Sequence, residues 1–204
     1  MKTGGRFSRG FFGRSCLEVG PELLGAYLVR RLPDGTRLAG RIVEIEAYLG
    51  DGSDPGSHTH RGETPRNRAM FGPPAHLYAY RSYGIHTCAN VVCEPAGRGA
   101  ALLLRALEPV AGARRMREAR GLGPDAPERE IANGPGKLCQ ALGITLDDYG
   151  RNLITGPLEL RRATPGDPPV RVERTRRVGL SQGREHPYRF LVRGSPFVSR
   201  ARPG

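Results

Sequence analysis

The residues best suited to chemistry lie close together, between Arg41 and Asn90. This stretch holds the acidic pair Glu44 and Glu46, together with four of the seven tyrosines and four of the five histidines. The aromatic residues are Tyr48, Tyr78, Tyr80, Tyr83, His58, His60, His76 and His86. Flat rings can stack on nucleobases and a carboxylate can activate water. The stretch therefore predicts an enzyme that draws a base out of the DNA stack and removes it.

The acidic pair lies in the run 41–48, which predicts a strand. Glu44 and Glu46 are two residues apart, so both side chains should point to the same face of that strand. Two like charges on one face repel, so we expect at least one of them near solvent, a cation or a polar site. An exposed strand edge would meet this condition. The apolar Ile42 and Val43 favour a partly dry cleft instead, where a carboxylate can act as a general base toward water.

Three tyrosines follow on a second predicted strand and its turn. Tyr78 and Tyr80 share one face of the strand, and Tyr83 lies at its end beside Gly84. A ring at the tip of a turn is exposed enough to wedge between base pairs. Ordinary packing is the alternative for all three rings, and for Tyr78 it is the favoured interpretation.

The charge of the chain points to a polyanionic partner. There are 32 basic and 20 acidic residues, a formal net charge of +12, and only Lys2 and Lys137 are lysines. The planar fork of arginine suits phosphate oxygens, which favours nucleic acid over other partners. The alternative is that arginine richness reflects genome composition and solubility.

Length and composition limit the remaining classes. With 204 residues, 29 glycines and 18 prolines, the chain should form one domain rich in loops. Its four cysteines contain no CxxC pair, which favours reduced thiols in a cytoplasmic protein over a metal site. No apolar run approaches the length of a membrane span, and no secretory signal is recognisable.

Strands should outnumber helices along the chain. We expect strands over 26–32, 36–48, 76–83, 87–93, 101–107, 157–162, 170–178 and 188–193. We expect short helices over 17–24, 114–120 and 137–142, and another that begins at Thr64-Pro65. Neighbouring strands with few intervening helices predict an α+β fold with a mainly antiparallel sheet. Residues 1–10 should form a flexible basic arm, and residues 11–204 a single domain.

A series of motifs then occurs in one order along the chain. They are Gly40 to Tyr48, Ser57-His58, Thr64-Pro65-Arg66-Asn67, Met70-Phe71, Leu77-Tyr78-Ala79-Tyr80, Tyr83-Gly84, Cys88-Ala89-Asn90 and the runs 103–109 and 134–142. Together they resemble the alkyladenine (3-methyladenine) DNA glycosylase family. The similarity extends from Phe11-Phe12 to the run 193–199, almost the whole chain. It implies a curved sheet flanked by short helices.

The resemblance also implies catalytic and DNA-binding roles. Glu46 matches the base that activates a water for attack on the deoxyribose C1′, and Arg105 matches an arginine near that water. Tyr83 matches the side chain that intercalates where the base has left the duplex. Arg66 and Lys137 are expected on the DNA backbone. For Lys137, which lies near a helix start, a solvated surface charge is the alternative.

Four further residues match the walls of a pocket for the flipped base. Tyr48 and His58 match the rings on its two sides, Tyr80 matches a further wall, and Asn90 matches an amide that disfavours the extra amino group of guanine. The loop before His58 is one residue longer than the family pattern, so His60 competes with it for this role.

The resemblance implies a monofunctional DNA glycosylase that acts on alkylated or deaminated purines in double-stranded DNA and starts base-excision repair. We expect a monomer without cofactor, metal or membrane contact. A lyase step would need a lysine in the pocket, and neither lysine matches one. The competing hypothesis is a damage-recognising protein without catalysis. A zinc deaminase is excluded because H-x-E and P-C-x-x-C are both absent.

Overall fold

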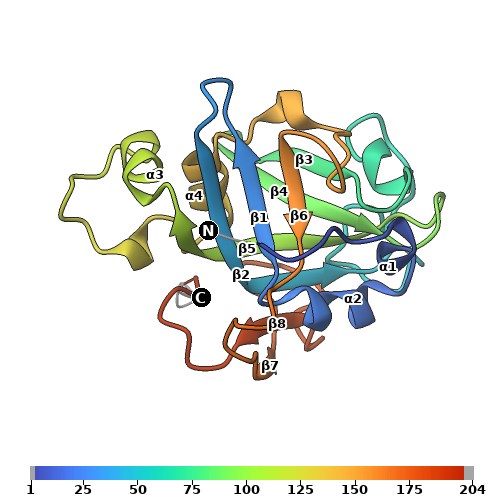
Figure 1. Cartoon of the computed structure of the whole chain (residues 1–204). Coiled ribbons are helices and arrows are strands. Elements are labelled where there is room, and N and C mark those ends of the chain that lie inside the picture. The colour runs from blue at the N-terminus through green and yellow to red at the C-terminus, as the bar shows by residue number, and fades with distance from the viewer. Residues whose placement is uncertain (1–2, 200–204) are drawn as a thin grey trace.

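The computed structural model describes residues 3–199 and is built around one antiparallel sheet (Figure 1). The eight strands within this range are ordered β3-β4-β5-β2-β1-β6, and β8 pairs with both β2 and β7. Their bounds are β1 Tyr27–Arg31, β2 Arg37–Tyr48, β3 Leu77–Ser82, β4 His86–Cys93, β5 Ala100–Ala111, β6 Leu158–Arg161, β7 Val172–Thr175 and β8 Arg189–Val192. Every pairing is antiparallel, which confirms the predicted sheet type.

Short helices flank the sheet, and the α+β prediction is confirmed. The α-helices are α1 Arg9–Phe12, α2 Cys16–Leu23, α3 Ala113–Ala119 and α4 Pro135–Leu142. Three short 3₁₀ helices are η1 Arg68–Phe71, η2 Glu128–Glu130 and η3 Leu146–Asp148. Gly20 lets α2 lie close against the sheet, because a Cβ there would come 2.9 Å from the ring of Phe190.

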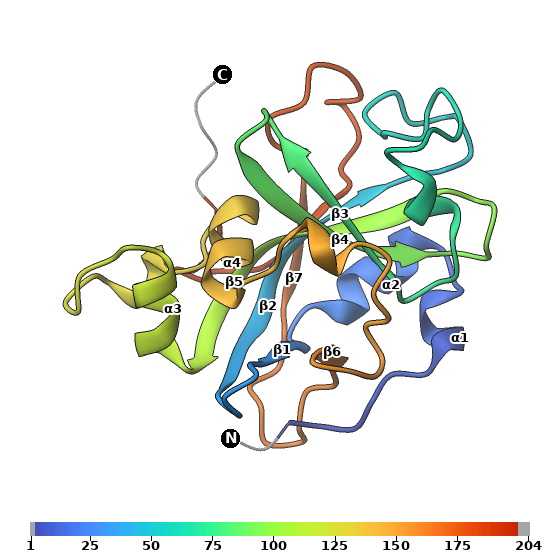
Figure 2. The same ribbon diagram turned by 90° about the horizontal axis from the view of Figure 1, so that it is seen from above.

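The strand β2 is the centre of the sheet. It pairs with β5 along most of its length, while β1 and then β8 pair with its other edge. The pairing with β5 shifts register twice in succession, so that Val43 is an extra residue on β2 and Arg105 an extra residue on β5. Bulges of this kind bend a strand and redirect its side chains. The sheet is curved as expected (Figure 2), and Arg105 stands at the point where its register shifts.

The segment expected to be a loose basic arm is packed against the domain where it is described. Met1 and Lys2 lie outside the described residues. The N–H of Gly4 donates to the carbonyl oxygen of Arg162 at 2.9 Å, and Phe7 is only 4% exposed. The Phe7 ring lies 4.6 Å from that of Phe11 and 5.4 Å from that of Phe12. The basic residues of this segment suggested an arm in solvent, but the free energy gained by burying the Phe7 ring outweighs their preference for water.

Removing the Phe7 ring should therefore destabilise the whole domain. We expect Phe7→Ala to lower the free energy of unfolding by about 3 kcal/mol, because it leaves a cavity among packed rings. Urea unfolding followed by circular dichroism measures this loss. Arg9→Ala, on an exposed side chain of the same segment, is the control and should change stability by less than about 0.5 kcal/mol. An equal, small effect of both variants would contradict the packing role of Phe7.

A second difference concerns Thr64-Pro65, expected to begin a helix. These residues form a turn, and the 3₁₀ helix η1 begins only at Arg68. The Oδ1 of Asn67 accepts from the N–H of Thr64 at 2.6 Å, so an amide side chain closes the turn that was expected to be helical. The strand expected over 170–178 is also shorter, because the chain leaves the sheet after Thr175.

Candidate active site

The two carboxylates of β2 are fully buried and share one arginine. Glu44 and Glu46 are both 0% exposed. The Nε of Arg105 donates to Oε1 of Glu44 at 2.9 Å, and its Nη1 donates to Oε2 of Glu46 at 3.1 Å. The bulge on β5 thus places a cation between two carboxylates on one face of β2. The expected need of the pair for a cation is met by Arg105.

Further contacts tie Glu44 firmly into the fold. Its Oε1 also accepts from Nε of Arg189 at 2.7 Å and from Oγ of Ser199 at 2.8 Å. The backbone N–H of Ser199 donates to its other oxygen. With two arginines and a serine around it, Glu44 is a structural anchor that fixes Arg105.

Glu46 has a different environment. Its Oε2 accepts from the hydroxyl of Tyr48 at 2.9 Å, and its Oε1 accepts from the backbone N–H of Val178 at 2.7 Å. Val178 lies where the chain has left β7, so this loop closes over the carboxylate. Glu46 shares a single arginine with Glu44 and stands beside an aromatic ring. A carboxylate held in this way can act as a general base toward water, and that role of Glu46 stays a prediction at this point.

The charge states around Glu46 are set by burial and by the carboxylates. Burial, and then the charge of Glu46, raise the pKa of Tyr48 well above its ordinary value, so its hydroxyl remains a donor. Burial alone would lower the pKa of Arg105, but Glu46 and Glu44 outweigh it and the pKa is raised. Arg105 therefore stays a cation at any pH at which the protein is folded.

A cluster of rings forms a second part of the site. The planes of Tyr78 and Tyr80 are stacked with centroids 5.5 Å apart, and the His58 ring meets Tyr80 edge-on at 4.6 Å. Nδ1 of His58 lies 3.0 Å from the hydroxyl of Tyr78. Tyr78 is 1% exposed and supports the cluster from within, as the packing interpretation expected. Burial raises its pKa to about 12.

Of the two competing histidines, the structure brings His58 to the rings. Both histidines are partly exposed, but the ring contacts above involve His58, whereas the backbone N–H of His60 bonds to the preceding turn. Nδ2 of Asn67 donates to the carbonyl oxygens of His58 and Gly62 at 2.9 and 3.0 Å, so the turn that replaces the expected helix holds the His58 loop. Burial, and then the nearby Arg66, lower the pKa of His58, which favours a neutral ring.

Asn90 lies beneath this ring cluster. It is 4% exposed and faces Tyr78 across the β3–β4 ladder. Its Nδ2 donates to the carbonyl oxygen of Tyr78 at 3.0 Å, which fixes the orientation of the amide. Arg66 is exposed, with its guanidinium carbon 5.7 Å from the centroid of Tyr80. Asn90 is therefore a buried, fixed amide beside the ring cluster and Arg66 lies exposed next to Tyr80, while their roles toward a base and the DNA backbone stay predictions.

Tyr83 stands at the tip of the β3–β4 hairpin. Its side chain is 85% exposed, and that of its neighbour Ile85 is 74% exposed. The N–H of Ile85 donates to the carbonyl oxygen of Ser82 at 3.0 Å, and both Tyr83 (φ +49°) and Gly84 (φ +70°) adopt the left-handed conformation. Such a conformation is unfavourable for a residue with a side chain. The hairpin tip therefore carries an exposed aromatic ring on a strained backbone.

Lys137 lies apart from the carboxylates, on the first turn of α4. Its side chain is exposed and its Nζ donates to Oδ1 of Asn133 at 2.8 Å. A Cβ on Gly136 would come 2.9 Å from that of His86, so the helix start lies directly against the hairpin. This position is consistent with a phosphate contact beside Tyr83, and that role stays a prediction.

The sequence interpretation missed Asp54 and Arg177. Both side chains are 0% exposed, and they form an ion pair with an N–O distance of 2.6 Å. They are 123 residues apart, and no local motif connects them. The only available signals were an isolated acid in a polar loop and an arginine beside the apolar Val178, and neither signal is specific.

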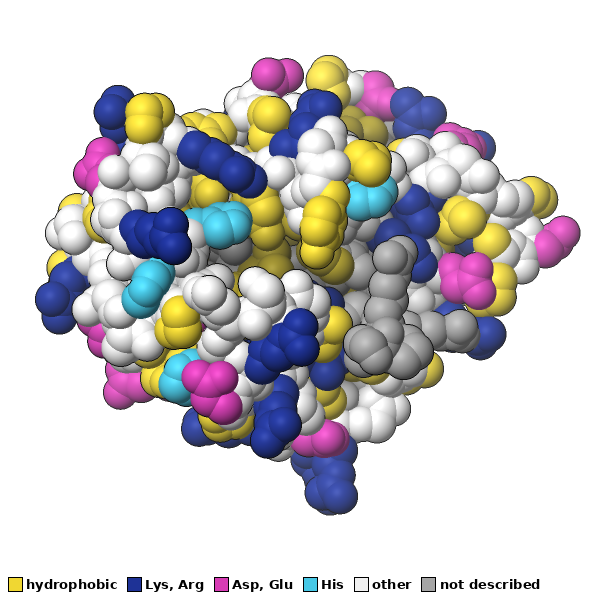
Figure 3. Space-filling view, turned by 180° about the vertical axis from the view of Figure 1, so that it is seen from behind, with side chains coloured by type: hydrophobic (Ala, Val, Ile, Leu, Met, Phe, Trp, Pro, Cys, Tyr) yellow, Lys and Arg dark blue, Asp and Glu magenta, His cyan; other side chains and the backbone are white. Residues whose placement is uncertain are grey.

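The elements that carry the ring cluster, Tyr83 and the pair Asp54–Arg177 project to one side of the sheet (Figure 2). They are the β3–β4 hairpin, the loop that follows β2, and the segment between β7 and β8. Viewed from that side, the surface is hollowed over hydrophobic side chains, with Lys, Arg and His side chains around the hollow and acidic side chains mostly toward the margin (Figure 3). A polyanion would meet this face favourably.

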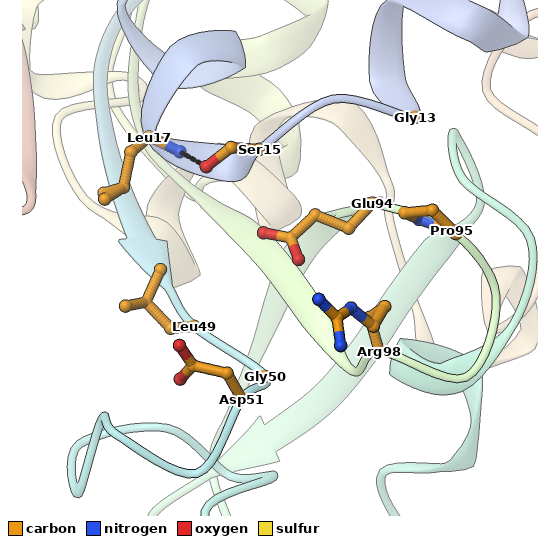
Figure 4. A pocket seen from close by; sticks show the side chains of 9 residues that line it. All are labelled: Gly13, Ser15, Leu17, Leu49, Gly50, Asp51, Glu94, Pro95 and Arg98. Atoms are coloured by element: carbon orange, nitrogen blue, oxygen red, sulfur yellow. Dashed lines mark hydrogen bonds between the residues drawn. The ribbon is translucent and has the colours of Figure 1, made fainter.

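A separate cavity of about 350 Å³ contains none of the predicted site residues. It is lined by Ser15, Leu49, Asp51, Glu94 and Arg98, among others (Figure 4). Within residues 3–199, no group of three His, Cys, Asp or Glu side chains could hold a metal ion. No helix in the same range is long and apolar enough to cross a membrane.

Comparison with known proteins shows the family to which the chain belongs. Residues 10–196 match the family model described as methylpurine-DNA glycosylase. A protein of Nitrosospira multiformis is 49% identical over 189 residues, covering 93% of this chain and 91% of that protein. One of Methanoculleus marisnigri is 48% identical over 194 residues, covering 93% and 96%. Both are provisionally named 3-methyladenine DNA glycosylases. The chain therefore belongs to the methylpurine-DNA glycosylase family and is a DNA glycosylase, a hydrolase.

Proposed function

We propose that this glycosylase turns an alkylated or deaminated purine out of duplex DNA and hydrolyses its N-glycosidic bond, with Glu46 as the base. The observation that carries the proposal is the placement of Glu46. Its carboxylate is fully buried, bonded to Arg105 and to the ring-bearing Tyr48. A buried anion beside an aromatic wall suits attack on a sugar whose base is stacked on that wall.

Capture of the base would draw on the rings of the site. Turning a nucleotide out of the duplex costs a few kcal/mol, and least when the base is damaged and poorly paired. Stacking on an aromatic ring returns about 1–3 kcal/mol per base. We assign Tyr48, His58 and Tyr80 to this stacking. A neutral His58, favoured by its lowered pKa, does not repel a purine made cationic by alkylation.

Hydrolysis would then proceed at the sugar. Glu46 takes a proton from water, the resulting hydroxyl bonds to C1′, and the electrons of the C1′–N bond leave with the base. The sugar becomes cation-like as this bond breaks, and the buried carboxylate stabilises that charge. Arg105, held by Glu44, keeps Glu46 oriented. A cationic alkylated purine leaves as a neutral base, so damage itself improves the leaving group.

Selection against normal guanine is assigned to Asn90. Its amide is buried and fixed by the carbonyl oxygen of Tyr78, so it cannot move aside for an additional amino group. An unmatched amino group in a buried site loses its hydrogen bonds to water without replacement. We further propose that the enzyme acts as a monomer, and that it leaves an abasic site for the following steps of base-excision repair.

Base release from single-lesion duplexes tests the proposal. The purified protein is incubated with otherwise identical duplexes that carry 3-methyladenine, hypoxanthine, ethenoadenine or no lesion, and free base is separated by chromatography. We expect base to appear only from damaged duplexes, with the DNA strand left unbroken. Binding without any base release would instead favour a damage-recognising protein that has lost catalysis.

The hairpin tip provides a second, independent test. Because Tyr83 has φ +49°, replacing it with glycine removes backbone strain as well as the ring. We expect Tyr83→Gly to lower lesion-duplex affinity about tenfold, while the thermal unfolding temperature stays equal or rises. Fluorescence anisotropy and differential scanning calorimetry measure the two effects.

Tyr83→Phe is the matched control, since it keeps the ring and the strain. It should bind lesion duplexes as the wild type does. If Tyr83→Gly keeps full affinity, the exposed ring does not intercalate, and its strained conformation needs another explanation.

A further inference from the structure

The buried ion pair between Arg177 and Asp54 has no role in the hydrolysis described above. Nη1 of Arg177 donates to Oδ2 of Asp54 at 2.7 Å, and its Nη2 donates to Oδ1 at 2.6 Å, so the pair is bidentate. Both side chains are completely buried. Burial alone would lower the pKa of Arg177, but the contact with Asp54 outweighs it and the pKa is raised. The guanidinium therefore remains charged inside the protein.

Arg177 reaches the ring that we assign to base stacking. Its guanidinium carbon lies 4.6 Å from the centroid of Tyr48, so the cation covers one face of that ring. Nη1 also donates to the carbonyl oxygen of Ala47 at 3.0 Å, which fixes the guanidinium to the end of β2. A base can therefore stack only on the opposite face of Tyr48.

The same residue holds the segment that contacts the catalytic carboxylate. Its Nη2 donates to the carbonyl oxygen of Gly183 at 3.1 Å, which ties the loop after β7 to the site. Val178, the residue that follows Arg177 in the chain, donates its backbone N–H to Glu46. Displacement of Arg177 would therefore move both the ring and the donor that orients Glu46.

Asp54 extends this arrangement to the loop that carries His58. Its Oδ2 accepts from the N–H of Leu49 at 3.1 Å, and its Oδ1 accepts from that of Gly56 at 3.0 Å. A Cβ on Gly56 or Gly183 would come 2.9 Å from Nη2 of Arg177, so the backbone encloses the ion pair without spare room. The pair thus joins the end of β2, the loop 49–57 and the segment 177–183 at a single point.

We propose that Arg177, held by Asp54, is a positioning residue that fixes the stacking face of Tyr48 and the hydrogen bond from Val178 to Glu46. The inference rests on the proposed function, because it assigns Tyr48 and Glu46 their roles. The pair acts on the DNA only through these two neighbours. Its loss should therefore impair lesion recognition and chemistry, while general contact with the DNA backbone is retained.

The test is the double variant Arg177→Met with Asp54→Asn, which removes both charges together and leaves neither buried alone. Binding is measured in a Glu46→Gln background, to an undamaged duplex and to the lesion duplex that the wild type cleaves fastest. We expect the preference for the lesion duplex to fall about tenfold, with affinity for the undamaged duplex within about twofold of the parent. In the protein that keeps Glu46, the double variant should lower the single-turnover rate of base release about tenfold relative to the wild type.

The double variant Arg6→Met with Glu159→Gln is the matched control, since it removes another ion pair whose acid is buried, at 3.5 Å on the edge strand β6. It should keep the wild-type preference. A retained preference in the Arg177 variant overturns the inference, and so does a parallel loss of both affinities, which would mark a purely structural pair. Failure of the wild type to release any base would refute the proposed function itself, a result distinct from both.

Discussion

Replacing Glu46 with glutamine should lower the single-turnover rate of base release by at least about a hundredfold, the usual contribution of a general base. The amide has the same shape: its one oxygen can still accept from the N–H of Val178, and its NH2 group can donate to the hydroxyl oxygen of Tyr48, so the pocket should persist. Affinity for a lesion duplex should therefore stay within about threefold of the wild-type value. Rapid-quench chromatography of released base and fluorescence anisotropy measure the two quantities.

Glu44→Gln is the control, because both variants exchange a buried carboxylate for an amide on the same strand. Glu44 is surrounded by Arg105, Arg189 and Ser199, so its loss should mainly reduce stability. Release rates that fall equally in the two variants would contradict separate roles for the two acids. A fully active Glu46→Gln enzyme would remove Glu46 as the base.

Arg105→Met should have the largest effect on stability. It leaves two buried carboxylates on one strand face without the cation between them. Removal of one partner from a buried ion pair typically costs 3–5 kcal/mol, because an uncompensated charge remains. We expect the free energy of unfolding to fall by about 4 kcal/mol in urea titrations at pH 7, with base release falling at least about tenfold.

The second change Glu46→Gln distinguishes charge from packing. In the Arg105→Met background it removes the carboxylate left without its arginine, whereas Glu44 still contacts Arg189, so it should restore about 1–2 kcal/mol of stability. In the wild-type background the same change should be destabilising. The same sign in both backgrounds would contradict the view that Arg105 chiefly neutralises the carboxylates.

Local patterns were sufficient to predict most of the sheet and the hairpin. Alternating residues and turn signals mark β1 to β4, and Tyr83-Gly84 marks the exposed tip. The two-residue spacing of Glu44 and Glu46 predicts their shared face, and a common contact with Arg105 follows. These features depend on neighbours in the chain, which is why the sequence contains them.

The contacts that complete the site could not be predicted in this way. Arg177 meets Asp54 across 123 residues, and Ser199 meets Glu44 across 155. Which distant residues meet depends on the curvature of the sheet. That curvature depends in turn on the bulges at Val43 and Arg105, and the residue types at these positions do not predict a bulge. The burial of Phe7 was missed for a similar reason. Its contacts with the rings of Phe11 and Phe12 form only in the folded chain, so the local sequence does not mark Phe7 as a core residue.

The β3–β4 hairpin bears on the way in which the proposed base flipping would begin. Its two strands are joined by an unbroken antiparallel ladder from Leu77 to Ser82, with Tyr78 and Tyr80 near the base and Tyr83 at the tip. Six paired positions tie the two strands together, and α4 lies against the hairpin where Gly136 meets His86. Under the proposed function, Tyr83 would probe a base step with the same hairpin that supplies Tyr80 as a wall of the base pocket. Insertion of Tyr83 and approach of that wall to the flipped base would then be coupled, so a base pair that resists insertion would also stay outside the pocket.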